Sequence, residues 1–544
     1  MFIKITKNAK GIGYYHLVES FRDNGKVKQR TLLSLGRVED GKLEALGELI
    51  SKHVETSQIF DLAKSIDIKD TYILGPLLVL QRLMDSLGIN NILRTIRHIN
   101  HKRLKFDFCK VVFTQVCSRF IKPVSKLALY DHWLERLYPV MIDHNTALHH
   151  IYRSLDILAQ SKEQIESYLY SYQKDLFSLT VDVVLYDLTT LRFESTIHDE
   201  GTLPQFGYSK EMRTDCTQVV LGLLTDTDGI PLCFEVHPGN TFEGKTLENI
   251  VDKIKERFSI RRFVFIADRG LFSSKNLEHI RAKKGEFIVG MKINSLPKAR
   301  RKQLYDLSKF IPINDELAIY ESTHGSDRLI ITWSKSRADR DRKAREEIVE
   351  KIRKKLSANK PVSRSFITNT NYRKYLIISS SENCQINDAA IEDEAGKDGF
   401  FGVITNVRSM SAQQIVTNYK QLWKIEDAFG EIKGSLKARP MFHWTDRRII
   451  GHLVLCFLAY YCEANLTKAL RENFLQLQSK SIEKKIIKQR PLTVVQAMQQ
   501  LCDVMAIPVT IKNHTYWIRT DIPPNATALL NAIGMRIPPK LLET

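Results

Sequence analysis

The sequence predicts an α/β fold in which a mixed β-sheet carries helices on its faces. Apolar runs rich in β-branched residues recur in the middle of the chain, a turn sequence joins two of them, and helical periods separate the later ones. The strands expected from these runs are residues 181–187, 217–225, 230–236, 263–268 and 286–292.

The order of these segments indicates how the strands pair. The sequence DTDG at 226–229 is a hairpin signal, so the first three strands are expected to form an antiparallel meander. Helical patterns at 245–258 and 273–284 precede the fourth and fifth strands. A helix between two strands favours parallel pairing, and a mixed sheet follows.

The regions on either side of this core have other patterns. Asn24-Gly25 between two strand-like runs predicts a hairpin, and a helical pattern follows from 41 to about 66. Further helices are expected through residues 71–178. Within them, the basic stretch RTIRHINHKRLK at 94–105 fits either phosphate contacts or a solvated basic face.

The later part of the chain has an interruption before a long helix. Strand-like runs and a charged helical stretch occupy residues 294–397, which we interpret as an insertion with β content. A strand at 399–405 then returns to the main sheet. A helix is expected from Ser411 to about Leu436, where Ser411 and Gln414 have the spacing of a capping box.

These patterns divide the chain into five parts. The predicted parts are 1–70, a hairpin and helix for DNA binding; 71–178, helical, for DNA binding or dimerisation; 179–293 with 398–440, the catalytic core; 294–397, the insertion; and 441–544, helical.

Composition restricts the partner and the compartment. The 544 residues carry a formal net charge of +19, which favours nucleic acid as the partner. The longest apolar run, at 453–462, is about half of a membrane span and predicts a buried helix. The first residues lack the apolar core of a signal peptide. Eight cysteines without a CxxC spacing fit free thiols, so we expect a cytoplasmic protein without a membrane partner.

Acidic residues stand where two of the predicted strands end. Asp187 ends the first strand and Asp268 ends the fourth. Two Mg²⁺ ions can activate a nucleophile and stabilise a leaving oxygen, and they need carboxylates on rigid elements. The alternative is that each Asp only caps the turn that follows it.

The third candidate acid is Glu426 in the predicted long helix. At 100° per residue, Glu426 shares one narrow stripe with Tyr419, Leu422, Phe429 and Lys433, beside the apolar face. Glu426 is therefore expected to point toward the sheet, with Lys433 able to reach a phosphate nearby. The alternative is an ordinary amphipathic helix.

With these residues the chain resembles the DDE transposases of bacterial insertion sequences, in the IS-four superfamily, whose core is RNase H-like. The helix of that family carries Tyr, two residues, Arg, three residues, Glu, six residues, Lys; Tyr419, Glu426 and Lys433 match, and Leu422 replaces the Arg. Blocks spread over nearly the whole chain resemble the IS1634 branch: SLGRVE, YDLTTLRFES, FGYSKEMRTD, GIPLCFEVHPGNTFEGKT, ADRG, DGFFGVITN and RRIIGHLVLCFLAYY.

The resemblance implies a role for each matching residue. Asp187, Asp268 and Glu426 would be the catalytic residues and hold two Mg²⁺ ions, with Mn²⁺ as a substitute. Tyr419 and Lys433 would contact DNA, as would Ser209, Lys210 and Arg213.

The resemblance also implies the partners. The N-terminal region would recognise the terminal inverted repeats, target DNA would be the second DNA partner, and a homodimer would form the synaptic complex. Two other functions stay open. A metal-dependent nuclease would use the same acids with water as its only nucleophile. A non-catalytic DNA-binding protein derived from a transposase would be marked by the loss of an acid, and all three are present.

Overall fold

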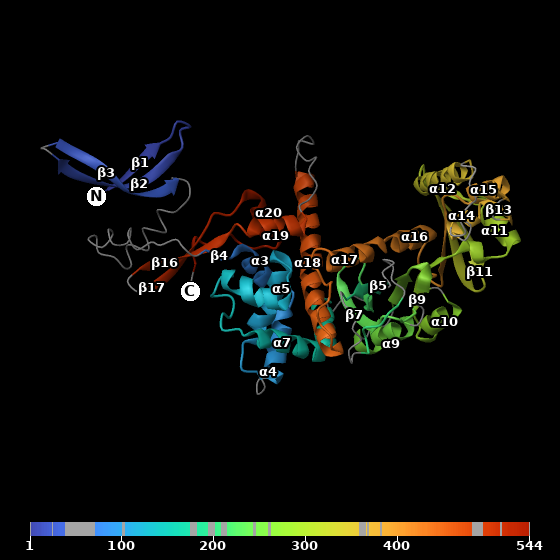
Figure 1. Cartoon of the computed structure of the whole chain (residues 1–544), viewed down its shortest axis with the longest axis horizontal. Coiled ribbons are helices and arrows are strands. Elements are labelled where there is room, and N and C mark those ends of the chain that lie inside the picture. The colour runs from blue at the N-terminus through green and yellow to red at the C-terminus, as the bar shows by residue number, and fades with distance from the viewer. Residues whose placement is uncertain are drawn as a thin grey trace. The chain divides into compact units, whose positions relative to one another are not determined.

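The chain divides into two compact units. The computed structural model describes residues 2–542 apart from 24–25, 38–70, 101–103, 175–181, 194–201, 208–214, 243–245, 259–262, 272, 358–365, 367–368, 381–382, 481–492 and 512–513. Unit 1 comprises residues 1–173, 199–201 and 430–544, and unit 2 comprises residues 174–198 and 202–429 (Figure 1).

Unit 2 is built on one nine-stranded mixed sheet, which confirms the predicted α/β class. Its order is β10-β11-β12-β15-β9-β8-β5-β6-β7. The strands are β5 Asp182–Arg192, β6 Gln218–Thr225, β7 Pro231–Pro238, β8 Phe263–Ala267, β9 Glu286–Met291, β10 Ile311–Asn314, β11 Leu317–His324, β12 Asp327–Ser334 and β15 Phe400–Thr405.

The pairing in the central part follows the predicted pattern. β5, β6 and β7 form the antiparallel meander, while β5, β8 and β9 are parallel. The β6–β7 turn is fastened by Asp226, whose carboxylate accepts from the backbone N–H groups of Asp228 and Ile230. Gly229 in this turn has φ +84°, a conformation that favours glycine.

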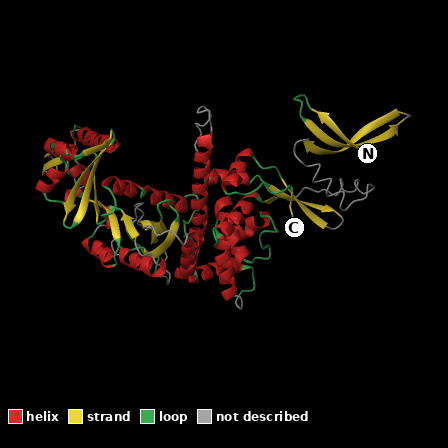
Figure 2. Cartoon of the chain, turned by 180° about the vertical axis from the view of Figure 1, so that it is seen from behind, coloured by secondary structure: helices red, strands yellow, loops and turns green. Residues whose placement is uncertain are grey.

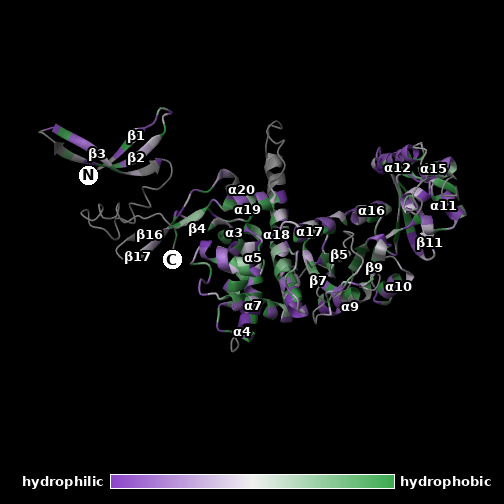
Figure 3. Ribbon diagram, viewed as in Figure 1, coloured by the Kyte–Doolittle hydropathy of each residue, from purple (hydrophilic) through white to green (hydrophobic). Residues whose placement is uncertain are grey.

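The helices of unit 2 lie against this sheet and beyond its edge (Figure 2). They are α9 Leu247–Phe258, α10 Ser274–Ala282, α11 Lys298–Leu304, α12 Lys335–Leu356, α14 Thr370–Arg373, α15 Asp388–Ala395, α16 Ala412–Lys420 and α17 Trp423–Lys433, the last crossing into unit 1. A hairpin of β13 Leu376–Ser380 and β14 Asn383–Ile386 stands apart from the main sheet. The charged α12 is mostly hydrophilic along its length (Figure 3).

The segment interpreted as an insertion has a closer relation to the sheet than the sequence indicated. Its strands β10, β11 and β12 extend the main sheet, because β12 pairs with β15. β15 in turn pairs with β9, which confirms the prediction that this strand belongs to the main sheet. The remainder of the segment forms a small cluster of its own, built on Ile352, Tyr375 and Leu376.

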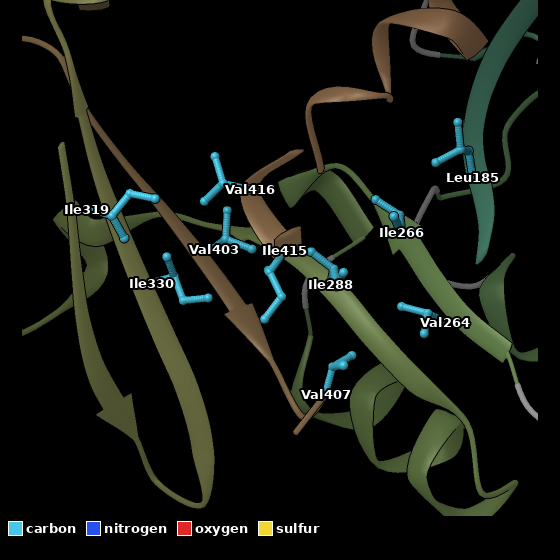
Figure 4. Packing of buried hydrophobic residues seen from close by; sticks show 10 residues of the cluster. All are labelled: Leu185, Val264, Ile266, Ile288, Ile319, Ile330, Val403, Val407, Ile415 and Val416. Atoms are coloured by element: carbon cyan, nitrogen blue, oxygen red, sulfur yellow. The ribbon is translucent and has the colours of Figure 1, made fainter. Parts of the chain in front are cut away.

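An apolar layer joins α16 to the sheet and fixes the place of that helix. Ile415 and Val416 of α16 belong to one buried cluster with side chains from six strands, among them Ile266, Ile288 and Val403 (Figure 4). The predicted capping box starts the helix: Ser411 Oγ accepts from the N–H of Gln414, whose side chain accepts from the N–H of Ser411. Tyr419 in the last turn of α16 also packs against this cluster, so the end of the helix lies over the sheet.

Unit 1 combines helices with two small sheets. The N-terminal sheet is β1 Phe2–Lys7, β2 Gly13–Asp23 and β3 Lys26–Arg37, and its β2–β3 pairing is the hairpin predicted from Asn24-Gly25. The second sheet has the order β18-β17-β16-β4, with β4 Tyr72–Ile73, β16 Met505–Ile511, β17 His514–Arg519 and β18 Leu541–Leu542. The helix expected at 41–66 lies outside the described residues.

The helices of unit 1 surround one long apolar helix. They are α3 Gly75–Ser86, α4 Ile89–Ile99, α5 Phe108–Ile121, α6 Lys126–Ala128, α7 Leu148–Gln160, α8 Lys162–Gln173, α18 Asp446–Lys480, α19 Val494–Leu501 and α20 Pro524–Ala532. By length and composition α18 is the one described helix able to cross a membrane, but 89% of its apolar window is buried inside the structure. It is therefore the buried helix that the sequence predicted.

Two further sequence expectations can be placed in unit 1. The basic stretch at 94–105 lies partly on α4, where Arg94 and Arg97 are exposed and stand 3.8 Å and 3.5 Å from carboxylate oxygens of Asp85 and Asp107. Across both units, none of the eight cysteines, all of which lie in the described residues, forms a disulfide.

Candidate active site

The sheet register sets Asp187 and Asp268 side by side. β5 and β8 run parallel, with pairs from Asp182 opposite Phe263 to Tyr186 opposite Ala267. One further step along both chains reaches Asp187 and Asp268. Because neighbouring strands lie about 4.8 Å apart, the backbones of these two acids are neighbours at the same level of the sheet. Asp187 is partly buried and Asp268 is exposed.

The position of Asp187 in its strand differs from the prediction. Asp268 follows the last residue of β8 as expected, but β5 continues five residues beyond Asp187, to Arg192. The reason is that β5 has two partners of unequal length. β6 pairs with β5 as far as Arg192, opposite Gln218, whereas β8 stops at Ala267. Asp187 therefore stands where the parallel pairing ends, in the middle of a strand.

Tyr419 contacts the second acid of this pair. Its hydroxyl donates to Asp268 Oδ1 at 3.2 Å, and its ring packs on Phe401 at 5.2 Å between centroids. Burial raises the pKa of Tyr419 strongly, and the negative charge of Asp268 raises it further, so the hydroxyl keeps its proton and acts as the donor. The resemblance assigned Tyr419 to DNA; that contact stays a prediction.

Gly290 on β9 provides the space for this contact. A Cβ atom added there would lie 2.5 Å from the Tyr419 hydroxyl, which is closer than such atoms approach. A glycine inside a strand often marks a close approach of another group, so this signal was present in the sequence and was not used. Gly290 is thus a residue of the site that the sequence reasoning missed.

Glu426 lies on a different helix from Tyr419. The single helix expected from Ser411 to Leu436 is two helices, because α16 ends at Lys420 and α17 begins at Trp423. Four backbone hydrogen bonds at this break are of the i to i+3 type; they are donated by residues 421, 422, 424 and 425. We call residues 421–425 the helix joint.

Because of the helix joint, Tyr419, Glu426 and Lys433 do not lie on one continuous helix, as their predicted common stripe required. Bonds of the i to i+3 type turn the chain by about 120° per residue and not 100°, so side chains before and after the joint lose the phase of a continuous helix. Glu426 lies in the first turn of α17 and is exposed, not at the border of a buried face. Lys424, which lies in the helix joint, donates from its amine to the carbonyl oxygen of Thr227 in the β6–β7 turn.

The three acids are not gathered into a finished metal site. Among the described residues, which include all three, no group of three or more His, Cys, Asp and Glu side chains is placed to hold a metal ion. The oxygen donors of Asp187 and Asp268 nevertheless suit a hard divalent cation, and their adjacency on the sheet is the arrangement that such a cation needs. The residues present therefore fit the expected cofactor in kind.

The other predicted DNA contacts divide into two groups. Lys433 is the last residue of α17, in the part of that helix that belongs to unit 1, and its phosphate contact stays a prediction. Ser209, Lys210 and Arg213 lie outside the described residues.

Comparison with known families identifies the class of protein, and the mixed α/β fold is consistent with it. Residues 181–462 match the model of the transposase DDE domain, and this range includes Asp187, Asp268 and Glu426. Residues 3–58 match the N-terminal domain of the IS1634 family transposases. The chain therefore belongs to the DDE transposases, in the IS1634 branch. A search of curated proteins gave no match.

Proposed function

We propose that this transposase binds the terminal inverted repeats of its insertion sequence and carries out Mg²⁺-dependent cleavage and joining of DNA strands. The observation that supports it most directly is the register of β5 and β8, which sets Asp187 beside Asp268 within the segment that matches the DDE domain. We further propose that β5 to β9 are an RNase H-like core, since a meander followed by two parallel strands suits that architecture.

The chemistry assigned to the site is phosphoryl transfer. Divalent metal ions, when bound, stabilise the charge on the attacking and leaving oxygens. Asp187 and Asp268 would supply the first carboxylate oxygens, and Glu426 would supply the third. The Tyr419 hydroxyl restricts the rotation of the Asp268 carboxylate, because it holds Oδ1.

The DNA partners are assigned to the basic surfaces. The N-terminal sheet exposes a series of basic side chains: Lys4, Lys7, Lys10, Lys26, Lys28, Arg30 and Arg37. A two-stranded ribbon fits the major groove, so the β2–β3 hairpin is suited to the inverted repeat. Lys433, Ser209, Lys210 and Arg213 are assigned to backbone phosphates. A homodimer would hold the two ends together, and target DNA would be the second substrate.

A strand-transfer assay tests the proposal. Purified full-length protein is incubated with labelled duplexes that carry the ends of its own element, a target plasmid and Mg²⁺. We expect end cleavage and joined products. Asp187→Ala, Asp268→Ala and Glu426→Ala should each lower cleavage by about 10³-fold or more, since each removes a ligand from one cooperative site. Binding of the ends should be retained.

Asp427→Ala is the matched control, because Asp427 is the exposed acid next to Glu426 on the same helix. It should keep wild-type cleavage. Cleaved ends that are never joined would favour the nuclease alternative. Specific binding without any cleavage would favour a non-catalytic DNA-binding protein. Full cleavage by an acid variant would remove that residue from the site.

A further inference from the structure

Four basic side chains are buried close to one another in the helical part of unit 1. Arg119 lies on α5, Lys126 begins α6, His443 lies in the segment before α18 and His452 lies on α18. Their exposed fractions are 4%, 3%, 7% and 6%. We call these four residues the buried basic cluster. Burial of a cationic group is costly unless the group is paired, so each nitrogen needs a partner.

The partners of Arg119 are backbone carbonyl groups. Nη1 donates to the carbonyl oxygens of Leu436 and Lys437, at 3.4 Å each, and Nη2 donates to that of Val124. Among the described residues, however, Arg119 Nε and Lys126 Nζ meet no hydrogen-bond acceptor. The three N–H groups of the ammonium and the Nε–H of the guanidinium therefore have no acceptor among the described residues.

His452 adds a further nitrogen. Its Nε2 lies 3.3 Å from the carbonyl oxygen of Ala438, which requires a proton on Nε2. Its Nδ1 is buried and meets no partner among the described residues. The ring centroid of His443 lies 5.1 Å away. The cluster thus has unpaired donors on α5 and α6, whereas the unprotonated Nδ1 of His452 on α18 is an acceptor.

The charges around the cluster do not balance. Burial lowers the pKa of Lys126, and the charge of Arg119 lowers it further. Burial also lowers the pKa of His452, with Lys126, His443 and Arg119 as further causes. Cys456 is the one described group that would offset them, and burial raises the pKa of its thiol. An arginine keeps its proton, so positive charge persists here without a carboxylate.

We propose that Arg119 and Lys126 form a buried binding site for one small monovalent anion such as chloride. The anion accepts from Lys126 Nζ and Arg119 Nε and offsets the charge that the carbonyl groups leave unbalanced. It links α5 to α6, so its role is to stabilise the helical part of unit 1. A DNA phosphate does not qualify as the occupant, because the four side chains are almost fully covered.

The melting temperature of the full-length protein tests this site. Sodium chloride is exchanged stepwise for sodium gluconate at constant ionic strength, since gluconate is too large for the site. We expect a saturable rise of about 2 °C when chloride reaches roughly ten times its Kd. Lys126→Met should reduce this rise to below about 1 °C, because the methionine fills the same space without a charge.

Lys122→Met is the control, because Lys122 is exposed and four residues away; it should keep the full rise. The ³⁵Cl NMR line width of the wild-type protein is the second measurement and does not depend on a folded Lys126 variant. Excess broadening that bromide displaces would support the site. Equal melting temperatures in both salts, an unchanged rise in Lys126→Met, or no excess broadening would overturn it.

Discussion

The two parts of the candidate active site are built in different ways. Asp187 and Asp268 are placed by the register of β5 and β8, so backbone hydrogen bonds on rigid strands fix their spacing. Glu426 is placed by the helix joint, where α16 passes into α17 through i to i+3 bonds. Hydrogen bonds between strands fix which residues are neighbours. The bonds of the helix joint are local, so they do not fix the distance from Glu426 to the strands. We therefore expect the two aspartates to be adjacent in the free protein, with Glu426 outside the pair.

The largest expected effect contrasts these two parts directly. Asp187→Asn should weaken Mn²⁺ binding by the free protein about 100-fold, since it removes one of two adjacent anionic ligands. Glu426→Gln should leave the same Kd within about twofold, because Glu426 is not gathered with the pair. Electron paramagnetic resonance of free Mn²⁺ measures both values. An equal loss in the two variants would show that all three acids are assembled before DNA arrives, and would break the comparison.

A smaller effect is expected where the two parts meet. Gly290→Ala would place a Cβ atom 2.5 Å from the Tyr419 hydroxyl and push that side chain off Asp268. Cleavage should fall by about 30-fold, equivalent to ~2 kcal/mol. Single-turnover cleavage of a labelled end measures it. Gly430→Ala is the control, because a Cβ atom there meets nothing within 4 Å. Equal rates for both variants would contradict the role of this contact.

Removal of the Tyr419 hydroxyl alone should lower the cleavage rate less than Gly290→Ala does. Tyr419→Phe keeps the ring on Phe401 and removes only the bond to Asp268. The expected loss is about tenfold in the cleavage rate with unchanged end binding, the usual size for one hydrogen bond to a charged group. Tyr419→Leu, which also loses the ring packing, should be worse. A Phe variant with weaker end binding and a normal rate would favour the DNA-contact role that the resemblance implies.

The smallest effect concerns the far end of α17. Lys433→Ala should reduce the slope of log K against log salt concentration for end binding by about 0.9, the value for one phosphate contact. Fluorescence anisotropy at several salt concentrations measures the slope. Lys437→Ala, an exposed lysine four residues later, is the comparison variant. An unchanged slope for Lys433→Ala would leave this lysine with a structural role on its helix.

Local patterns predicted the strands well, and long-range relations account for the differences. Apolar runs located β5, β8 and β9, and the end of FVFIAD located Asp268. The extension of β5 beyond Asp187 depends on the lengths of two partner strands, which no single segment contains. The joint after Lys420 carries no Pro or Gly to mark it. Tyr419 and Asp268 meet across 151 positions, beyond any local period.

The buried basic cluster shows the same limit in unit 1. Arg119 and Lys126 stand near one another in the sequence, but His443 and His452 come more than 300 positions later. In the sequence each of them is an unremarkable basic residue. Only the packing of α5 and α18 makes them neighbours, so no spacing could have indicated the cluster.

The place of β15 in the sheet has a consequence for synthesis on the ribosome. β15 lies between β9 and β12, yet it is the last of the nine strands to be made. Until residue 405 leaves the exit tunnel, β9 and β12 each present an unpaired edge to other chains. Nascent chains on neighbouring ribosomes could pair through those edges. The yield of soluble protein should therefore depend on the speed of translation across residues 292–405.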